Sequence, residues 1–285
     1  MKTFASLFLL VLFSLPSYAI DLTLYEGEAY WDKVDALDWK EGPLTINHTN
    51  QGKVKLKKGE VALINDDAKQ IMYWINGVQF TSTLYITTDY SSYTDYRYVN
   101  EGYVKLDDWK DVNADKFIKQ LRDDSKEGNK IRAENNMPTV ERMEWITEPT
   151  LDRLKNSVYY ALDVYFSNGE SSVNASLLLL GRYGYTEVSY TGEPDYFREN
   201  KETILTHIVE NYSFVEEKKY SNFTTGDKVA AAGIGGLLAA SLGIKAFKVG
   251  GIAALLLILK KAWFIIFIPF VFAWGWIKRL FSRNS

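Results

Sequence analysis

The charges of this chain divide it into two unlike parts. All 36 acidic residues lie before position 228, and the last 58 residues are apolar and carry only positive charge. Residues 20–227 hold 24 Lys and Arg against 36 Asp and Glu, a net charge of −12. Apolar segments flanked by positive charge are typical of membrane anchors. The pattern therefore predicts a water-soluble acidic body at 20–227 and a membrane-anchoring tail at 228–285.

Two segments of the tail are candidates for membrane helices. Residues 229–244 and 262–277 are each 16 residues long without a charge, and Trp residues flank the second where interfacial aromatics are expected. At 1.5 Å per residue each spans about 24 Å, and flanking lysines extend that reach by snorkelling. The positive charges slightly favour a two-helix hairpin over one crossing, so the number of crossings stays open.

The first tail segment also carries small residues at a spacing of four. The two rows are Ala232, Gly236 and Ala240, and Gly235, Ala239 and Gly243. Such rows let helix backbones approach closely in lipid, and they predict a contact with the second segment or with another copy of the chain. Membrane helices are rich in Gly and Ala in any case, so the two interpretations weigh equally.

The N-terminus has the features of an export signal. Lys2 supplies a positive charge, residues 4–13 are apolar, and Pro16 precedes small residues at the positions that a signal peptidase reads. We expect cleavage after Ala19, so that residues 1–19 are a signal peptide. Together with the tail, this predicts a protein of the bacterial inner membrane whose main domain faces the periplasm.

The composition excludes several classes of function. The chain has no cysteine, which rules out disulfides, thiol catalysis and cysteine-ligated metals. The acidic body lacks the clustered positive charge that nucleic-acid binding requires. His48, in an expected turn, and His207, on an expected helix, are the two histidines, and no P-loop, His-Glu-x-x-His or nucleophile-elbow motif occurs. We therefore predict no cofactor, no metal site, no catalytic residue and no nucleic-acid partner.

Strand patterns dominate the body. Residues 157–166 have a period of two, as in a half-buried antiparallel strand, and 95–106 also keeps its apolar residues on one parity. Residues 175–180 are typical of a central strand buried on both faces, and 185–190 follow after a glycine turn.

Helices are interleaved with these strands. We expect one from Asn113, as its cap, to about Asn136, one from Pro194 to Tyr212, and a shorter one at 66–75. This order of elements predicts an α+β fold with helices packed on a mixed or antiparallel sheet, followed by the helical membrane tail.

One stretch of the body carries a distinctive motif. Residues 101–108 read EGYVKLDD, which resembles the GYVKDDD signature of the DUF2167 family of bacterial membrane-anchored proteins. Further matches occur in the family's order at Gly42-Pro43, Trp145, 172–174, 180–185 and 227–231. Leu106 stands where the family often has an acid, and 56–80 match loosely. The resemblance implies a signal peptide, an exported body and a C-terminal membrane segment, but no reaction, because the family is functionally uncharacterised.

An acidic cluster follows the motif and comprises Asp107, Asp108, Asp111, Asn113 and Asp115. Its last three members have the spacing of a calcium loop, but Lys116 stands where the turn requires Gly, and Glu is missing at position twelve. A capped helix N-terminus explains the cluster better. Asp107 and Asp108, taken as strand neighbours, are expected to point to opposite faces.

Five residues are candidates for contact with a ligand. They are Tyr103, Asp107, Asp108, Asn174 and Arg182. Arg182, near two glycines, is suited to hold a carboxylate bidentately, although anchoring of its own loop to Asp107 or Asp108 is favoured. Tyr103 ends a tyrosine-dense stretch that either packs within the sheet or binds envelope sugars or a protein.

Three functions are compatible with the sequence. The first is a non-enzymatic binding or scaffold module of the cell envelope, with a protein partner or a second copy of the chain. The second is an exported hydrolase or transferase that uses Asp107, Asp108 and Arg182. The third is an accessory subunit of a membrane transporter. The first is favoured because the chain lacks a catalytic motif and its tail carries small-residue rows.

Overall fold

The computed structural model describes residues 28–76, 81–88, 92–134 and 137–242. The expected signal peptide, Gly243 and the second tail segment at 262–277 lie outside these residues. The strands are β1 (Lys40–Glu41), β2 (Leu44–His48), β3 (Gly52–Leu56), β4 (Val61–Ile64), β5 (Leu84–Thr87), β6 (Tyr93–Val99), β7 (Val140–Asp152), β8 (Ser157–Phe166), β9 (Ser171–Gly181), β10 (Gly184–Gly192) and β11 (Tyr212–Phe214). The helices are α1 (Glu28–Asp35), α2 (Asn65–Asn76), α3 (Ala114–Glu134), α4 (Pro194–Asn211) and α5 (Ile234–Ser241), with 3-10 helices at Asp107–Asp111 (η2), Glu216–Lys218 (η3) and Tyr220–Asn222 (η4).

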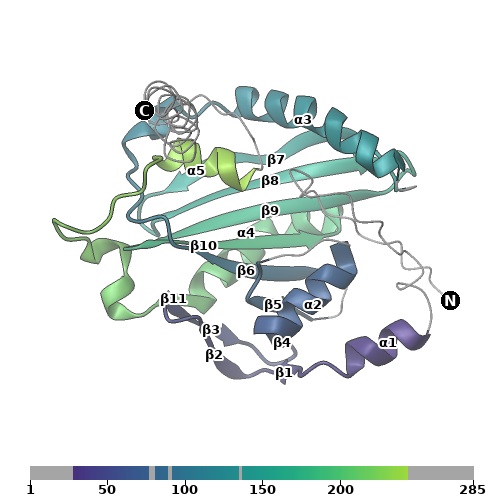
Figure 1. Ribbon diagram of the computed structural model, residues 1–285, viewed down its shortest axis with the longest axis horizontal. Coiled ribbons are helices and arrows are strands. Elements are labelled where there is room, and N and C mark those ends of the chain that lie inside the picture. Colours follow the sequence, from purple (N-terminus) through teal and green to yellow (C-terminus); the bar gives the residue numbers. More distant parts are fainter. Residues whose placement is uncertain (1–27, 77–80, 89–91, 135–136, 243–285) are drawn as a thin grey trace, which may run out of the picture. The chain divides into compact units, whose positions relative to one another are not determined.

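Eight of the strands form one large sheet in the order β1-β4-β5-β6-β10-β9-β8-β7 (Figure 1). Every neighbouring pair in it is antiparallel. A second, small antiparallel sheet has the order β11-β3-β2. The α+β prediction is confirmed, and of the two sheet types that the sequence allowed, the antiparallel one is present.

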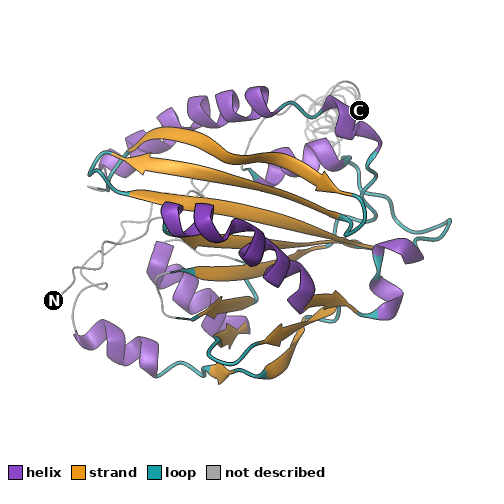
Figure 2. Cartoon of the chain, turned by 180° about the vertical axis from the view of Figure 1, so that it is seen from behind, coloured by secondary structure: helices purple, strands orange, loops and turns teal. Residues whose placement is uncertain are grey.

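Helices cover both faces of the large sheet. Helices α2, α3 and α5 lie on one face, and α4 lies on the other together with the small sheet (Figures 1 and 2). This cover explains one difference from the sequence prediction. The strand expected to be half-buried, β8, is buried on both faces, because α4 also covers the side on which Ala161 and Asp163 lie. The prediction of β9 as a central buried strand is confirmed.

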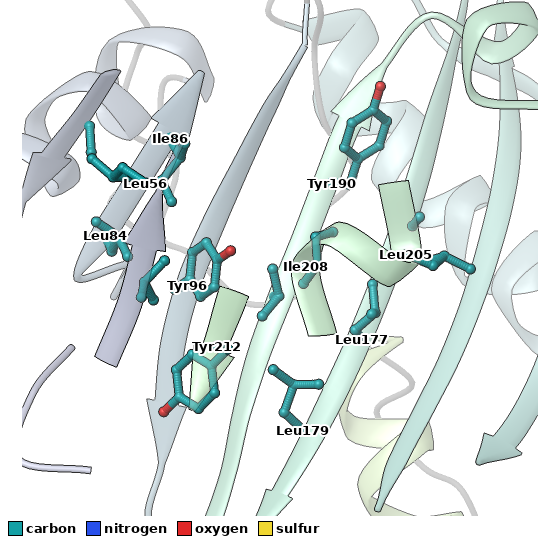
Figure 3. Packing of buried hydrophobic residues seen from close by; sticks show 14 of the residues in the cluster. Leu56, Leu84, Ile86, Tyr96, Leu177, Leu179, Tyr190, Leu205, Ile208 and Tyr212 are labelled. Atoms are coloured by element: carbon teal, nitrogen blue, oxygen red, sulfur yellow. The ribbon is translucent and has the colours of Figure 1, made fainter. Parts of the chain in front are cut away.

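The main core lies between α4, the small sheet and the large sheet (Figure 3). Leu177 and Leu179 of β9 pack there with Leu205 and Ile208 of α4. Fully burying each such side chain stabilises the fold by about 1.5–3 kcal/mol. Tyr212, which the sequence placed on the helix, instead begins β11, because the chain becomes extended there and pairs with β3.

The ends of the helices follow local chemistry. Asn113 caps α3, since its Oδ1 accepts a hydrogen bond from the Lys116 backbone N–H at 2.9 Å. Pro194 occupies the first turn of α4, where a backbone N–H would have no acceptor within the helix, so the helix loses no hydrogen bond to proline. The short helix predicted at 66–75 is α2. The three expected helices are thus present, and the cap explains part of the acidic cluster.

Two other expectations about the body are wrong. The strand predicted over 95–106 ends at Val99, and beyond it Gly102 leaves the extended conformation with a φ of +98°, which is open chiefly to glycine. His48 is not in a turn but ends β2, where it is 1% exposed. Its Nε2 lies 2.8 Å from the Thr83 hydroxyl, and its ring meets those of Tyr96 and Tyr212 edge-on.

Candidate functional site

Four of the five candidate residues surround one stretch of chain, Tyr220–Gly235, at one end of the large sheet. Tyr103 and Arg182 contact this stretch directly, as does Asp108, whereas Asp107 is exposed beside them. The contacts of Tyr103, Asp108 and Arg182 with Tyr220–Gly235 are called the clasp below. Asn174 does not belong to it. It pairs with Thr191 and Leu162, seven residues along β9 from Gly181, where the Arg182 turn begins.

Arg182 ties the turn between β9 and β10 to Asp227. Its Nε donates to Asp227 Oδ2 at 2.7 Å, and its Nη2 donates to Oδ1 at 2.9 Å and to the Thr224 hydroxyl at 2.8 Å. The hydrogen bonds from the guanidinium, and next the one that the Thr224 N–H donates to Oδ2 at 2.8 Å, lower the pKa of Asp227 to about 2. Anchoring within the chain was the favoured prediction for Arg182, but its partner is Asp227, not Asp107 or Asp108.

Tyr103 packs its ring within the clasp. The ring stacks on Tyr220 with 4.4 Å between centroids, and on Phe223 with 4.1 Å. The Tyr220 hydroxyl donates to the Val104 carbonyl at 2.7 Å. Stacked aromatic pairs stabilise a contact beyond the area they bury. Tyr103 is therefore half-buried by the chain itself, and both faces of its ring have partners in the chain.

The backbone of the motif also holds this stretch. The Tyr103 N–H donates to the Lys228 carbonyl at 2.7 Å, and the Ala230 N–H donates to the Tyr103 carbonyl at 2.9 Å, which makes a short parallel bridge with Val229. A Cβ on Gly102 would lie 2.5 Å from the Lys228 oxygen. The glycine of the motif is required both by this approach and by its positive φ.

Asp108 holds the start of α5. Its Oδ2 accepts a hydrogen bond from the Gly235 N–H at 3.2 Å, and its negative charge faces the positive end of the helix dipole. A Cβ on Gly233 would lie about 2.5 Å from the same carboxylate. The expectation that Asp107 and Asp108 are strand neighbours is wrong, because both lie on η2.

Helix α5 occupies the middle of the first predicted membrane segment. Ile234 and Leu238 are fully buried, and the Ser241 hydroxyl lies 3.2 Å from the Tyr160 hydroxyl of β8. Of the small-residue rows, Gly235 and Ala239 are buried, while Ala232 and Gly236 are half-buried and Ala240 is exposed. Within the described residues, no helix is both long and apolar enough to cross a membrane. The proposed helix contact in lipid stays a prediction.

The remaining ionisable groups of note lie in the core and at its rim. Burial lowers the pKa of His48 to about 4, and burial raises the pKa of Asp95, which accepts a hydrogen bond from the Ser82 hydroxyl at 2.8 Å, to about 7. His207 on α4 lies 2.6 Å from the Glu60 carboxylate. In the part of the chain that the structure describes, no three acidic or histidine side chains are grouped to hold a metal ion.

Sequence reasoning missed the partners in the clasp, which are Tyr220, Phe223, Thr224, Asp227 and Gly233. The match at 227–231 and the small-residue rows drew attention to this region, but neither indicated a contact with the motif at 101–108. Arg182 and Asp227 are 45 residues apart, and Asp108 and Gly235 are 127 apart, so no local spacing signals either pair. An arginine such as Arg182 has many acidic residues along the chain as possible partners, so the sequence alone does not single out Asp227.

These features define a class of protein: an α+β domain whose chain, after its last strand, is clasped back onto one end of an antiparallel sheet. The chain belongs to the family described as proteins of unknown function DUF2167, whose model matches residues 40–271. The match includes the motif at 101–108, the Arg182 turn and the whole clasped stretch. The resemblance noted in the sequence is thereby confirmed.

Comparison with known proteins adds little beyond the family. No curated protein matches the chain. Among solved structures, the solution structure of the cyanobacterial PsbP protein (CyanoP) from Synechocystis sp. PCC 6803 is similar, at 11% sequence identity and a TM-score of 0.36. The similarity covers 60% of this chain and 92% of that one. At these values it carries no argument about fold or function.

Proposed function

We propose that this protein is a non-enzymatic binding or scaffold module of the bacterial cell envelope, anchored in the inner membrane by residues 262–277. Its α+β body would lie in the periplasm and bind a protein partner or a second copy. The observation that carries the proposal is the clasp. The most distinctive motif of the chain, residues 101–108, grips the stretch that leads directly into the apolar tail. Its residues hold the chain against the body as far as α5, beyond which the sequence continues to the proposed anchor.

The enzymatic alternative loses the residues on which it depended. General acid–base chemistry requires groups within hydrogen-bond reach of one reacting atom. Arg182 is committed to Asp227, and Asp108 is directed at α5. Asp107 is exposed, and no hydrogen bond joins it to Asp108 or Arg182 among the described residues. The arrangement therefore favours a structural use of these side chains.

The position of α5 supports one crossing of the membrane in place of a hairpin. A helix cannot be packed into the body and span a bilayer at the same time. Since Ile234 and Leu238 are 0% exposed, residues 229–244 belong at least in part to the body, which leaves 262–277 as the anchor. Lys278, Arg279 and Arg283 would then lie in the cytoplasm, although the count of positive charges taken alone slightly favours the hairpin.

Thiol labelling in cells tests this topology, because the chain has no cysteine of its own. Tyr196→Cys places a thiol on α4, where the native side chain is 56% exposed, and Arg283→Cys places one beyond the anchor. With a reagent that does not cross the inner membrane, we expect the thiol at position 196 to react in spheroplasts. The thiol at position 283 should react only after the inner membrane is opened.

Three other results would contradict the proposed topology or the anchor. A thiol at position 196 that reacts only after lysis of the inner membrane would place the body in the cytoplasm and end the proposal. Reaction of both thiols in spheroplasts would overturn the single crossing in favour of the hairpin. Recovery of the full-length protein without detergent would remove the anchor itself.

A further inference from the structure

The turn between β7 and β8 carries the most exposed large apolar side chain of the described residues. Leu154 is 96% exposed at the centre of this turn. Isolated exposed leucines are common on protein surfaces, so exposure alone assigns nothing. Three further features of the turn, namely its rigidity, its charge and its aromatic neighbours, give Leu154 a specific setting.

The turn is held in one conformation. Asp152 Oδ1 accepts hydrogen bonds from the Leu154 N–H at 2.9 Å and from the Lys155 N–H at 3.0 Å. At the base of the turn, the Asn156 carbonyl accepts from the Leu180 N–H at 2.9 Å. These hydrogen bonds fix the backbone of the turn, so that the Leu154 side chain points into solvent from a defined position.

The charges beside Leu154 are basic and uncommitted. Arg153 and Lys155 flank it in the sequence, both are exposed, and neither forms an ion pair within the part of the chain that the structure describes. The nearest carboxylate in the sequence, that of Asp152, is occupied by the backbone of the turn. The tip of an acidic body thus presents one apolar side chain between two free cations.

An aromatic pocket adjoins the turn. Trp109 of η2 and Tyr159 of β8 line it together with Arg153, and its volume is about 500 Å³. The turn also lies beside the clasp: burial raises the pKa of the Tyr220 phenol, and the nearby Arg153 charge opposes that rise. Apolar, basic and aromatic groups therefore meet at the end of the sheet from which the clasped stretch enters α5.

We propose that the β7–β8 turn is a lipid-contacting tip: Leu154 inserts between acyl chains while Arg153 and Lys155 bind lipid phosphates. The combination of an apolar side chain with flanking cations and interfacial Trp and Tyr is the one that suits the headgroup boundary of a bilayer. The inference rests on the proposed membrane anchor, because the tail keeps the body close to that surface. It assigns a face of the body to the membrane, which the anchor alone does not.

Site-specific fluorescence in vesicles tests the tip with the full-length protein. A polarity-sensitive dye is attached to Leu154→Cys and, as a matched control, to Tyr196→Cys. The control lies at the start of α4, near the sheet end where β10 finishes, whereas the tip lies near the end where β10 begins. With quencher groups carried on the lipids, we expect several-fold stronger quenching at position 154 than at position 196. Equal quenching at the two positions would overturn the proposal.

A second variant separates insertion from mere nearness to the membrane. The dye is placed at Lys155→Cys with and without Leu154→Asp, a change at a site too exposed to affect folding. The quenching should fall to the level of position 196 when Asp is present. With the dye at Leu154→Cys, where both cations are intact, vesicles that contain anionic lipid should give stronger quenching than purely zwitterionic ones, and no difference between them would remove Arg153 and Lys155 from the proposal.

Vesicle flotation distinguishes this inference from the anchor on which it rests. A protein that floats with the vesicles but shows no quenching at position 154 overturns the tip and leaves the anchor standing. A protein that does not float overturns both.

Discussion

The core under α4 and the clasp use different means to hold the same chain. The core joins buried aliphatic and aromatic side chains, such as Leu177, Ile208 and Phe197. The clasp joins half-exposed groups through an ion pair, stacked rings and backbone hydrogen bonds. Apolar burial is additive and tolerant of detail, whereas a clasp of polar contacts depends on each partner. The difference indicates that the core sets the stability of the body and that the clasp sets where the next segment begins.

The largest effect should come from a cavity in the core. Phe197 on α4 is 0% exposed and packs against Tyr190 with 5.3 Å between ring centroids. We expect Phe197→Ala to lower the free energy of unfolding by about 4 kcal/mol, measured by denaturant titration in detergent. Tyr196→Ala, one residue away and 56% exposed, is the control and should change it by less than about 0.5 kcal/mol. Similar losses in both variants would contradict the location of the core.

Protonation of His48 should weaken the core in a pH range over which the clasp keeps its ion pair. The pKa of buried His48 is lowered to about 4, so the unfolded chain binds a proton that the folded protein does not, and stability falls as the pH drops from 6.5 to 4. The loss attributable to His48 is about 3 kcal/mol. The Asp227 carboxylate, whose pKa is about 2, keeps its pair with Arg182 over the same range.

The pH profile has to be measured in the Asp95→Asn background. The raised pKa of Asp95, about 7, acts in the opposite sense, because the folded protein then binds the extra proton and gains stability as the pH falls from 7 to 4. In that background, unfolding curves between pH 7 and 4 should show the His48 slope, and His48→Gln should flatten it. A slope that survives His48→Gln would assign it to another group.

A smaller effect should separate the clasp from ordinary turn strain. Gly102 and Gly59 have similar φ values, +98° and +90°, but a Cβ on Gly102 would meet the Lys228 carbonyl, whereas a Cβ on Gly59 would meet nothing within 4 Å. Gly59→Ala should cost about 1 kcal/mol, and Gly102→Ala about 2 kcal/mol more. Faster tryptic cleavage at Lys228 is expected only in Gly102→Ala. Equal costs and equal cleavage would mean that the clasp does not depend on this approach.

Local patterns in the sequence predicted β6, β8, β9 and β10 and helices α2, α3 and α4, but they did not predict β1–β5, β7 or β11, several of which contribute to the core. Strands β9 and β10 and helices α3 and α4 are continuous segments whose apolar spacing signals their own burial. The prediction that β8 is half-buried is wrong because α4 covers its second face. That contact depends on the tertiary packing and leaves no local pattern in the sequence. His48 was misplaced for the same reason, since its neighbours Thr83, Tyr96 and Tyr212 come from distant segments.

The sequence predicted the clasp only in part: it identified Tyr103, Asp108 and Arg182 as candidate residues but not their partners. The motif at 101–108 was singled out by its resemblance to the family and Arg182 by its neighbouring glycines, but their roles could not be predicted, because each role is defined by a partner in 220–235. The alternation over 95–106 predicted a strand through Gly102, whereas β6 ends at Val99 and Gly102, with its positive φ, precedes the hydrogen bond from Tyr103 to Lys228. Asn174 belongs to the sheet alone, and no spacing distinguished it from the true members of the cluster.

The clasp also has a consequence for the order in which the protein is made. Asp108 and Gly235 are 127 residues apart, and Val104 and Tyr220 are 116 apart. During synthesis, residues 101–108 therefore have no clasp partners until nearly the entire body has been made. Closure of such a distant contact comes after the local structure between its ends. Formation of the clasp is thus a late step of folding, and a chain truncated before Tyr220 cannot form it.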